Sequence, residues 1–359
     1  MKAIVKYGAP QIKGTYHFID IPEPVCGDDD VIIEVKAAAI CGADMLHWGV
    51  ENGCTEFNHV RGHEFSGEIV EVGKNVTAWK IGQRVVSDNT GHVCGKCPAC
   101  MRGDFLLCSE HVNLGLGYGY SGGFTKYCKI PGEILRIHPQ ALWEIPENVS
   151  YEEAAVLDPI SNAYKAVAEE SNLLPGENIV IFGTGPLGLF ATQMAKIMGA
   201  VNIIMVGLQE DVPYRFPVAL KCGATACVNG STEDVVARCK ELCGGADSVD
   251  LVVDCAGAPS SLQQGIAMLR NNGQLVRIGQ GFRPLNFDIN DITKKGLDIK
   301  GHMAYNSISW KNSINLLKSG LIKVEPMITH RLGLSQWKEG FEKMASREAI
   351  KVIFHYDCD

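Results

Sequence analysis

The chain has 359 residues, 46% of them hydrophobic and 21% charged, an ordinary globular composition with room for two domains. A net charge of -8 without any lysine or arginine run argues against partners such as nucleic acid or an anionic membrane. Segment 1–14 lacks a signal-peptide core, and Lys196 interrupts the longest apolar stretch. Fourteen cysteines, most without ligand spacing, fit a reducing compartment, so we expect a cytoplasmic protein.

The first 150 residues resemble a mostly β domain. Val31–Val35 and Glu68–Val72 alternate with β-branched residues, and clusters of Gly, Asp and Asn separate such segments. Near residue 150 the pattern changes, because Ser150 and Glu153 form a capping box that predicts a helix through the Glu152–Glu169 region.

Several candidate metal ligands lie in this first region. A thiolate from Cys41, an imidazole from His63 and a carboxylate from Glu64 can hold zinc and leave one position open. Asp158 offers a further carboxylate near the domain junction, and Asp44 could orient His63 by accepting its second ring proton. Taken singly, these residues also fit a buried thiol, a structural hydrogen-bonding histidine and a turn aspartate.

A second candidate metal site is a tight cysteine cluster with the pattern C-x2-C-x2-C-x7-C. Four thiolates can close a tetrahedral shell around one zinc, which makes the site structural rather than catalytic. Two disulfides, an iron–sulfur cluster and a nucleic-acid-binding zinc module are the alternatives, and the reducing context and acidic charge disfavour the first and last. The four cysteines are Cys94, Cys97, Cys100 and Cys108.

After the capping box, short apolar segments alternate with helical ones. This alternation predicts a parallel sheet covered on both faces. The expected strands are Asn178–Phe182, Asn202–Val206, Ala226–Val228, Leu251–Asp254 and Gln274–Ile278, and the expected helices are Pro186–Met198, Pro217–Lys221, Glu233–Leu242 and Ser260–Leu269. From residue 299 we expect the chain to return to the first domain and to end in the strand Ile350–His355, forming a cleft between the domains.

A G-x-G-x-x-G motif joins the first of these strands to its helix, as in a dinucleotide site. Its glycines allow a tight turn and close approach to a pyrophosphate, which the helix N-terminus favours. The expected cofactor-binding residues are Gly183, Gly185, Pro186, Leu187 and Gly188, with Arg215 and Ile278 further along the chain. Gly207 stands where an acid for the adenosine ribose is expected, so NADP is conceivable, although the acidic residues that follow favour NAD.

Across its whole length the chain resembles the zinc-dependent medium-chain dehydrogenases. The resemblance rests on CGAD at 41–44, GHEFSG at 62–67, the four-cysteine cluster, GTGPLG at 183–188 and the terminal return. It is most similar to the polyol dehydrogenases (sorbitol, erythritol and threitol) and to the threonine dehydrogenases. The resemblance implies a GroES-like mostly β catalytic domain at 1–155 and 299–359, with a zinc lobe at about 90–112, and a Rossmann doubly wound domain at 156–298.

The resemblance also implies a function. We expect two zinc ions per chain, NAD as the cofactor, and oxidation of a secondary hydroxyl of a small polyol; a homotetramer or homodimer is implied as well. Threonine oxidation, another sugar alcohol and a non-enzymatic cofactor-binding protein are the alternatives. His47, Trp48 and Tyr305 are the expected substrate contacts.

Three departures from the family pattern affect these expectations. Ala43 replaces the hydroxyl residue that begins a proton relay in many relatives, and we expect a water-linked route through Glu64 instead. Ala304 beside Tyr305 breaks the Arg–Tyr pair of sorbitol-type enzymes. Lys165 replaces the histidine of threonine-type enzymes, which weakens the threonine alternative.

Overall fold

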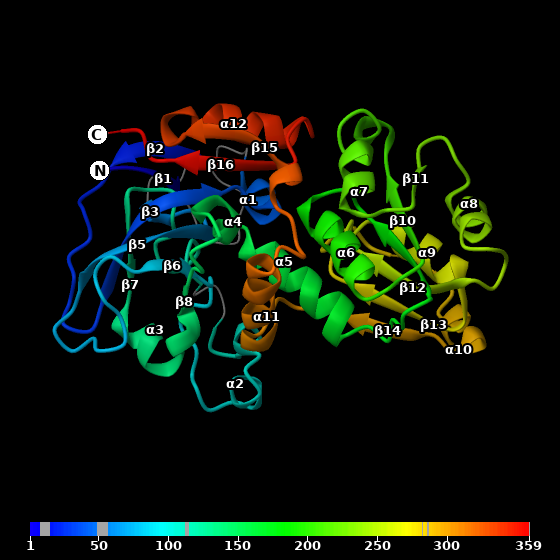
Figure 1. The fold of residues 1–359 in the computed structure, drawn as a ribbon, viewed down its shortest axis with the longest axis horizontal. Helices are drawn as coiled ribbons and strands as arrows, with labels where there is room; N and C mark the ends of the chain where they lie inside the picture. Colours follow the sequence, from blue (N-terminus) through cyan, green and yellow to red (C-terminus); the bar gives the residue numbers. More distant parts are fainter. Residues whose placement is uncertain (8–14, 49–56, 112–114, 282, 286, 359) are drawn as a thin grey trace. The chain divides into compact units, whose positions relative to one another are not determined.

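The computed structural model describes residues 1–7, 15–48, 57–111, 115–281, 283–285 and 287–358. These residues form two compact units, shown as ribbons in Figure 1. The first comprises Met1–Asp158, Asn306–Lys318 and Ile328–Asp359, and the second comprises Pro159–Tyr305 and Ser319–Met327.

The first unit is built mainly from antiparallel strands. One sheet has the order β2-β1-β4, and a second has the order β15-β16-β3-β5-β6-β8, with β7 also paired to β3. The strands are β1 (Lys2–Tyr7), β2 (Tyr16–Asp20), β3 (Val31–Ala39), β4 (Phe57–Val60), β5 (Glu64–Val72), β6 (Arg84–Ser87), β7 (Tyr127–Ile130), β8 (Leu142–Glu144), β15 (Ile328–Gly333) and β16 (Lys351–His355). The helices are α1 (Gly42–His47), α2 (Pro98–Met101), α3 (Gly132–Ile137), α4 (Tyr151–Ala155), α11 (Ser307–Lys318) and α12 (Trp337–Ala345).

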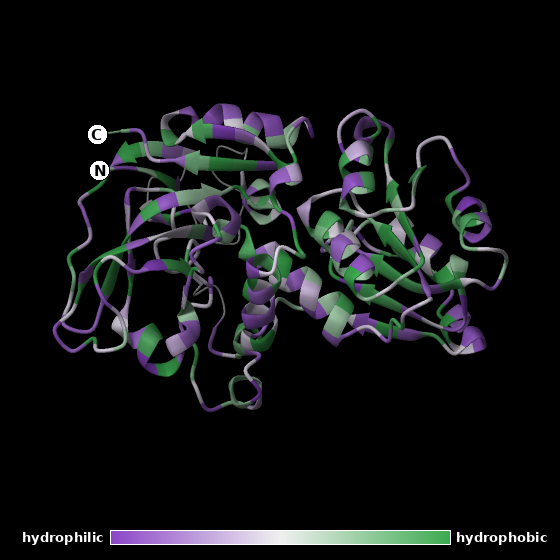
Figure 2. Ribbon diagram, in the orientation of Figure 1, coloured by the Kyte–Doolittle hydropathy of each residue, from purple (hydrophilic) through white to green (hydrophobic). Residues whose placement is uncertain are grey.

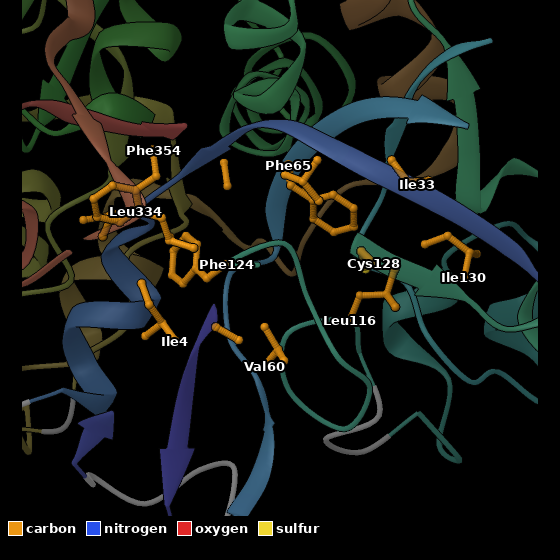
Figure 3. Close-up of a cluster of buried hydrophobic side chains, with 14 of the residues drawn as sticks. Ile4, Ile33, Val60, Phe65, Leu116, Phe124, Cys128, Ile130, Leu334 and Phe354 are labelled. Carbon is orange, nitrogen blue, oxygen red and sulfur yellow. The ribbon is translucent and has the colours of Figure 1, made fainter. Parts of the chain in front are cut away.

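Alternating apolar residues of these strands form one buried core, part of which is drawn in Figure 3. Ile33 of β3 pairs with Ile69 of β5 on one side and with Cys128 of β7 on the other, so a single register places three apolar side chains together. Phe124 and Phe354 pack edge to face at 5.6 Å between ring centroids. The core therefore fixes β3 and β5, which lead to Cys41 and contain Glu64.

The second unit is a doubly wound parallel sheet, as the alternation of segments predicts. The strand order is β11-β10-β9-β12-β13-β14, which is the Rossmann order. The strands are β9 (Asn178–Phe182), β10 (Asn202–Gly207), β11 (Ala226–Asn229), β12 (Val249–Asp254), β13 (Leu269–Arg277) and β14 (Asp298–Gly301). The helices are α5 (Leu157–Tyr164, whose first two residues belong to the first unit), α6 (Pro186–Ile197), α7 (Phe216–Cys222), α8 (Val235–Leu242), α9 (Pro259–Met268) and α10 (Asn290–Lys295). Figure 2 shows the central strands as predominantly apolar, in keeping with a sheet covered on both faces.

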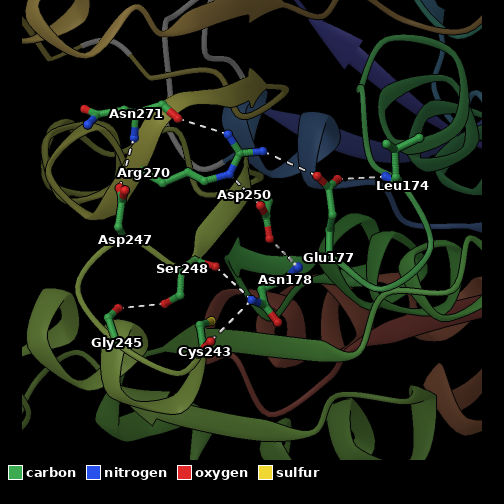
Figure 4. A network of polar contacts seen from close by, with 10 residues as sticks. All are labelled: Leu174, Glu177, Asn178, Cys243, Gly245, Asp247, Ser248, Asp250, Arg270 and Asn271. Carbon is green, nitrogen blue, oxygen red and sulfur yellow. Dashed lines mark hydrogen bonds and ion pairs between the residues drawn. The ribbon is translucent and has the colours of Figure 1, made fainter.

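Polar contacts tie the amino ends of these strands together (Figure 4). Arg270, at the start of β13, donates from Nε to Asp250 Oδ1 of β12 at 2.5 Å and from Nη2 to Glu177 Oε1 at 3.4 Å. Asp250 Oδ2 accepts the backbone N–H of Asn178, the first residue of β9, at 2.8 Å. Two charge pairs and a hydrogen bond from the backbone thus hold β9, β12 and β13 in register at their amino-terminal ends.

Two predicted boundaries differ from the structure. Residue 299 lies inside β14, which pairs in parallel with β13, so the chain returns to the first unit only at Asn306. The single helix expected through Glu152–Glu169 is divided into α4, α5 and a π-helical turn at Lys165–Glu169. Pro159 falls in the first turn of α5, where a missing backbone N–H costs no helical hydrogen bond.

Candidate functional site

The structure brings three of the predicted metal ligands together. Cys41 is the N-cap of α1, while His63 immediately precedes β5 and Glu64 is its first residue. One ligand atom from each residue lies within 4.8 Å of the others. His63 and Glu64 are 3% and 1% exposed, whereas Cys41 is half-buried, so two of the three side chains are shielded from water.

The electrostatics of this set fit a divalent cation. Burial raises the pKa of the Cys41 thiol well above its usual value, and the Glu64 carboxylate raises it further. Burial lowers the pKa of His63, which favours the neutral imidazole that binds metals. Ionising the Cys41 thiol beside the Glu64 carboxylate is costly without a further positive charge, and zinc supplies that charge with these ligand types. Cys41, His63 and Glu64 therefore form a chemically suitable zinc site.

Asp158 lies near this set but outside it. Desolvation raises the pKa of Asp158 to about 8, and Glu64 adds to the shift. Its Oδ2 accepts a hydrogen bond of 2.7 Å from Asn89 Nδ2. Direct ligation by Asp158 stays a prediction, whereas its electrostatic influence on Cys41 is part of the site.

Asp44 supports the set from α1. Its Oδ2 accepts the backbone N–H of Cys41 at 3.0 Å, which fixes the start of the helix. Its Oδ1 lies 3.9 Å from His63 Nδ1 and 3.6 Å from Arg61 Nη2. The first distance exceeds a hydrogen bond, so Asp44 faces the imidazole without the direct bond that we expected. Arg61 in turn stacks on Tyr118, 4.6 Å from the ring centroid.

A buried lysine completes the surroundings of the ligands. Lys351, the first residue of β16, donates from Nζ to Glu64 Oε2 and to the backbone oxygen of Ile40, the latter at 3.1 Å. Burial alone would lower the pKa of Lys351, but Glu64 and Cys41 raise it on balance. The chain thus provides one internal cation that offsets part of the negative charge of the set.

The four-cysteine cluster also assembles as predicted. All four residues are free thiols, and their sulfur atoms lie within 4.8 Å of one another. Backbone N–H groups point at the sulfurs, including Cys97 N to Cys94 Sγ at 3.3 Å and Cys94 N to Cys108 Sγ at 3.4 Å. The hydrogen bond from Cys100 N contributes most to lowering the pKa of Cys97. This geometry suits a second, closed zinc site.

In the second unit, the glycine-rich turn lies at the carboxyl end of β9. Gly183 has φ +100°, and a Cβ at Gly188 would meet Gly183 O at 1.9 Å, so both positions require glycine. A Cβ at Gly185 would find no described atom within 4 Å. Thr184 Oγ1 is buried and has no hydrogen-bond partner among the described residues. The turn therefore offers open space and an unused hydroxyl next to the N-terminus of α6, as a dinucleotide pyrophosphate requires.

A cavity of about 390 Å³ lies at the carboxyl ends of β13 and β14. Its lining residues are Arg277, Ile278, Gly279, Gln280, Gly281, Gly301 and His302. It includes Ile278, one of the expected cofactor contacts. His302, one of the lining residues, is held in place by Glu170 at 2.6 Å and by Asn162 at 3.0 Å.

Comparisons with known proteins agree with this arrangement. A family model described as the alcohol dehydrogenase GroES-like domain matches residues 27–140, and one described as zinc-binding dehydrogenase matches residues 186–319. The chain is 63% identical over 360 residues to an uncharacterized zinc-type alcohol dehydrogenase-like protein, YdjL of Escherichia coli, with 100% of both chains covered.

The chain belongs to the zinc-binding alcohol dehydrogenase family. It is therefore an oxidoreductase that uses zinc and a nicotinamide cofactor and acts on small-molecule alcohols.

Other members of the alcohol dehydrogenase family match over almost the full length. L-threonine 3-dehydrogenase of Bacillus velezensis is 35% identical and sorbitol dehydrogenase of Halalkalibacterium halodurans 34% identical, each with 98% of both chains covered. Among solved structures, 2R,3R-butanediol dehydrogenase from Bacillus subtilis has a TM-score of 0.84 at 29% identity, with 99% of both chains covered. A putative zinc-binding dehydrogenase from Sinorhizobium meliloti bound to NADP has a TM-score of 0.82 at 28% identity, covering 99% of this chain and 98% of that chain.

The predicted substrate contacts of this alcohol dehydrogenase have different surroundings. Trp48 packs on Phe341 with ring centroids 5.5 Å apart, so its ring contributes to the core of the first unit. Tyr305 is 3% exposed and belongs to the second unit. The side chain of His47, the last residue of α1, lies outside the described residues. Contact of any of the three with substrate stays a prediction.

Sequence reasoning missed other residues of the dehydrogenase site. Lys351 is separated from Glu64 by 287 positions, and nothing local identifies it. Arg61 left little signal, because its sequence neighbours are partly polar, and only the structure shows that its charge is buried and needs a partner. Among the residues that the structure describes, we find no helix long and apolar enough to span a membrane.

Proposed function

We propose that this dehydrogenase oxidises a secondary hydroxyl of a small polyol of the erythritol or threitol type and passes the hydride to NAD. The observation that carries the proposal is the set of Cys41, His63 and Glu64, which is suited to a zinc that keeps one position open. A cytoplasmic location remains part of the proposal.

Each side chain around the set has a definable task. Bound zinc would act as a Lewis acid toward the substrate hydroxyl. Lys351 holds the Glu64 carboxylate in place, and Asp44 holds the backbone of Cys41. Ala43 has no hydroxyl that could remove the proton, so we propose Glu64, through water, as the proton acceptor. If Glu64→Gln kept full turnover with an unchanged pH profile, this route would be excluded.

The substrates named for the relatives favour an alcohol with a polar neighbour. Sorbitol, D-arabitol phosphate, L-threonine and 2R,3R-butanediol each carry a secondary hydroxyl beside a carbon that bears oxygen or nitrogen. A polyol shares that feature and needs no charged partner. We therefore rank a small polyol above a simple alkyl alcohol.

Lys165 bears on the threonine alternative. An amino-acid substrate requires a cation for its carboxylate. Lys165 is buried, lies 3.9 Å from Glu170 Oε1 and donates to Met303 O at 3.4 Å. Because Glu170 already faces this ammonium, Lys165 is poorly suited to binding a substrate carboxylate. Arg61 and Lys351 are likewise engaged by Asp44 and Glu64, which disfavours a phosphorylated polyol.

The test is a substrate panel followed at 340 nm with zinc-loaded protein. The panel contains erythritol, both threitols, sorbitol, xylitol, arabitol phosphate, 2,3-butanediol and threonine, each with NAD and NADP. Preferred turnover of four-carbon polyols would support the proposal. Turnover of threonine alone would replace it with the threonine alternative. Cys41→Ser is the matched inactive control, because it removes one ligand with almost no change in volume.

We further propose that the enzyme is a homodimer or homotetramer. All four residues of β14 are exposed, although β14 is the edge strand of the parallel sheet. An exposed edge strand offers unpaired backbone groups to a second strand. Antiparallel pairing of two copies about Ile299 would set Asp298 opposite Lys300 of the second copy, a favourable charge pair. Light scattering of the wild type and Ile299→Pro would test this, because proline removes a backbone donor from the edge.

A further inference from the structure

Gly207 ends β10 at the point where a Rossmann domain usually carries its acid for the adenosine ribose. The structure shows why no side chain occurs there. A Cβ at Gly207 would lie 2.6 Å from Phe216 Cε1 and 2.7 Å from Thr184 Cγ2. Such contacts are closer than real Cβ atoms make, so an aspartate at 207 would displace either α7 or the glycine-rich turn. The glycine is therefore imposed by packing and does not by itself indicate NADP.

A carboxylate nevertheless occupies this place. Asp211, four residues further along, has its Oδ2 atom 3.0 Å from where the Cβ of residue 207 would be. The same oxygen accepts the backbone N–H of Leu208 at 2.8 Å. Asp211 is 1% exposed, and Arg215 Nε lies 3.7 Å from its Oδ1. The acid missing from the sequence motif is thus brought to the end of β10 by the short helical turn at Gln209–Asp211.

The backbone donors after Gly207 are also occupied. Leu208 donates its N–H to Asp211, and Gln209 donates its N–H to Ser231 Oγ at 3.1 Å. A 2′-phosphate at this strand end would have to compete for those N–H groups and would meet a carboxylate. Arg215 is the nearby cation, but Asp211 Oδ1 lies 3.7 Å from its Nε, so the pair has no excess positive charge to attract the phosphate.

We propose that Asp211 is a specificity-determining residue that selects NAD over NADP by supplying, from a displaced position, the carboxylate that Gly207 lacks. This inference rests on the NAD dependence within the proposed function and names the residue responsible for it. Two features combine: a buried carboxylate beside the strand end where the adenosine ribose would bind, and a hydrogen bond that takes up the first backbone donor, the N–H of Leu208.

The experiment measures binding and needs no alcohol substrate. Dissociation constants for NADH and NADPH are obtained by nicotinamide fluorescence for the wild type, Asp211→Asn and Ser231→Ala. Asp234→Asn is the matched control, because Asp234 is an exposed N-cap of α8 whose side chain accepts the N–H of Ala237 at 3.1 Å. Competition by 5′-AMP and 2′-AMP reports on the adenosine half alone.

We expect the wild type to bind NADH more tightly than NADPH. Asp211→Asn should reduce that ratio by about tenfold or more, the size expected for the loss of one like-charge contact. Ser231→Ala frees the N–H of Gln209 without changing the carboxylate, so it should reduce the preference for NADH less. The control variant Asp234→Asn should not change this preference.

Three results would overturn the inference. They are a wild type that prefers NADPH, a ratio unchanged in Asp211→Asn, or equal losses for both cofactors, which would mark Asp211 as a structural cap only. If Asp211→Asn does not fold, the inference would also be overturned by two results together. The ratio of the NADH and NADPH dissociation constants would be unchanged in Ser231→Ala, and 5′-AMP and 2′-AMP would compete equally well. If none of the polyols were oxidised, the proposed function would be refuted, but the ratio of NADH to NADPH binding would still test the role of Asp211.

Discussion

Replacing Lys351 with methionine should destabilise the metal-free protein strongly. The side chain of Lys351 is 2% exposed and that of its partner Glu64 is fully buried, so the substitution leaves a carboxylate inside the protein without a cation. It also removes the donor to Ile40 O. Breaking a buried ion pair in this way costs about 3–5 kcal/mol, because the remaining charge keeps its desolvation penalty.

The double variant Lys351→Met/Glu64→Gln separates this penalty from the loss of packing. With neither charge of this pair left, its cost should be only about 0–2 kcal/mol. The control is Arg331→Met, which breaks a surface pair with Glu152 (2.9 Å, with the Arg331 side chain 42% exposed) in the same unit. Surface pairs contribute about 0–1 kcal/mol.

The assay is urea unfolding followed by tryptophan fluorescence, with EDTA present so that zinc does not bind Glu64. We expect the order of destabilisation to be the Lys351→Met single variant, then the double variant, then the control. The reasoning would be refuted if the single variant cost no more than Arg331→Met, or if the double variant were as unstable as the single.

Three further predictions concern metals and protons. Cys100→Ser should lower the zinc content, measured by atomic emission, from two per chain to one, in line with the two ligand groups. The apparent zinc affinity of the open site should rise with pH, because the raised pKa values of Cys41 and Asp158 mean that zinc binding displaces protons. Titration calorimetry in buffers of different ionisation enthalpy measures this proton release, and its absence would refute the prediction. Burial, followed by Arg61, lowers the pKa of Lys6 to about 8. Above that pH the unfolded chain binds more protons at Lys6 than the folded protein does, so the free energy of unfolding rises with pH. Between pH 7 and 9.5 the wild type should therefore gain about 1–2 kcal/mol of stability relative to Lys6→Met. Parallel plots of unfolding free energy against pH for the two proteins would contradict the lowered pKa.

Local sequence patterns were sufficient for the parts of the fold that local physics determines. The strand Asn178–Phe182, the glycine turn after it and the cysteine cluster depend on neighbouring residues, and all three appear as predicted. The strand β14 was missed because Asp298–Gly301 is exposed and short, and so lacks an apolar run. The edge of a sheet leaves a weak sequence signal.

The candidate metal ligands could be proposed from the sequence, whereas the charged residues that surround them could not. Cys41, His63 and Glu64 stand in recognisable motifs, whereas Lys351 reaches Glu64 only because β16 pairs with β3. Asp211 was predicted only as one of the acidic residues that follow Gly207, and its position at the end of β10 was not, for a related reason. The motif places an acid at position 207, and only the packing of Phe216 against Gly207 shows that the acid must come from elsewhere.

The ion pairs of Arg270 with Asp250 and Glu177 lie at the amino ends of the strands, whereas the glycine turn and Asp211 lie at the carboxyl ends. The groups that keep the sheet in register are therefore separated, by the length of a strand, from the groups that we propose for cofactor binding. Substitutions that change cofactor choice can therefore accumulate at the carboxyl ends of the strands without destabilising the ion pairs at the amino ends. Such a division leaves the enzyme free to acquire a new coenzyme preference while its scaffold stays intact, and changes made at the two edges should combine additively.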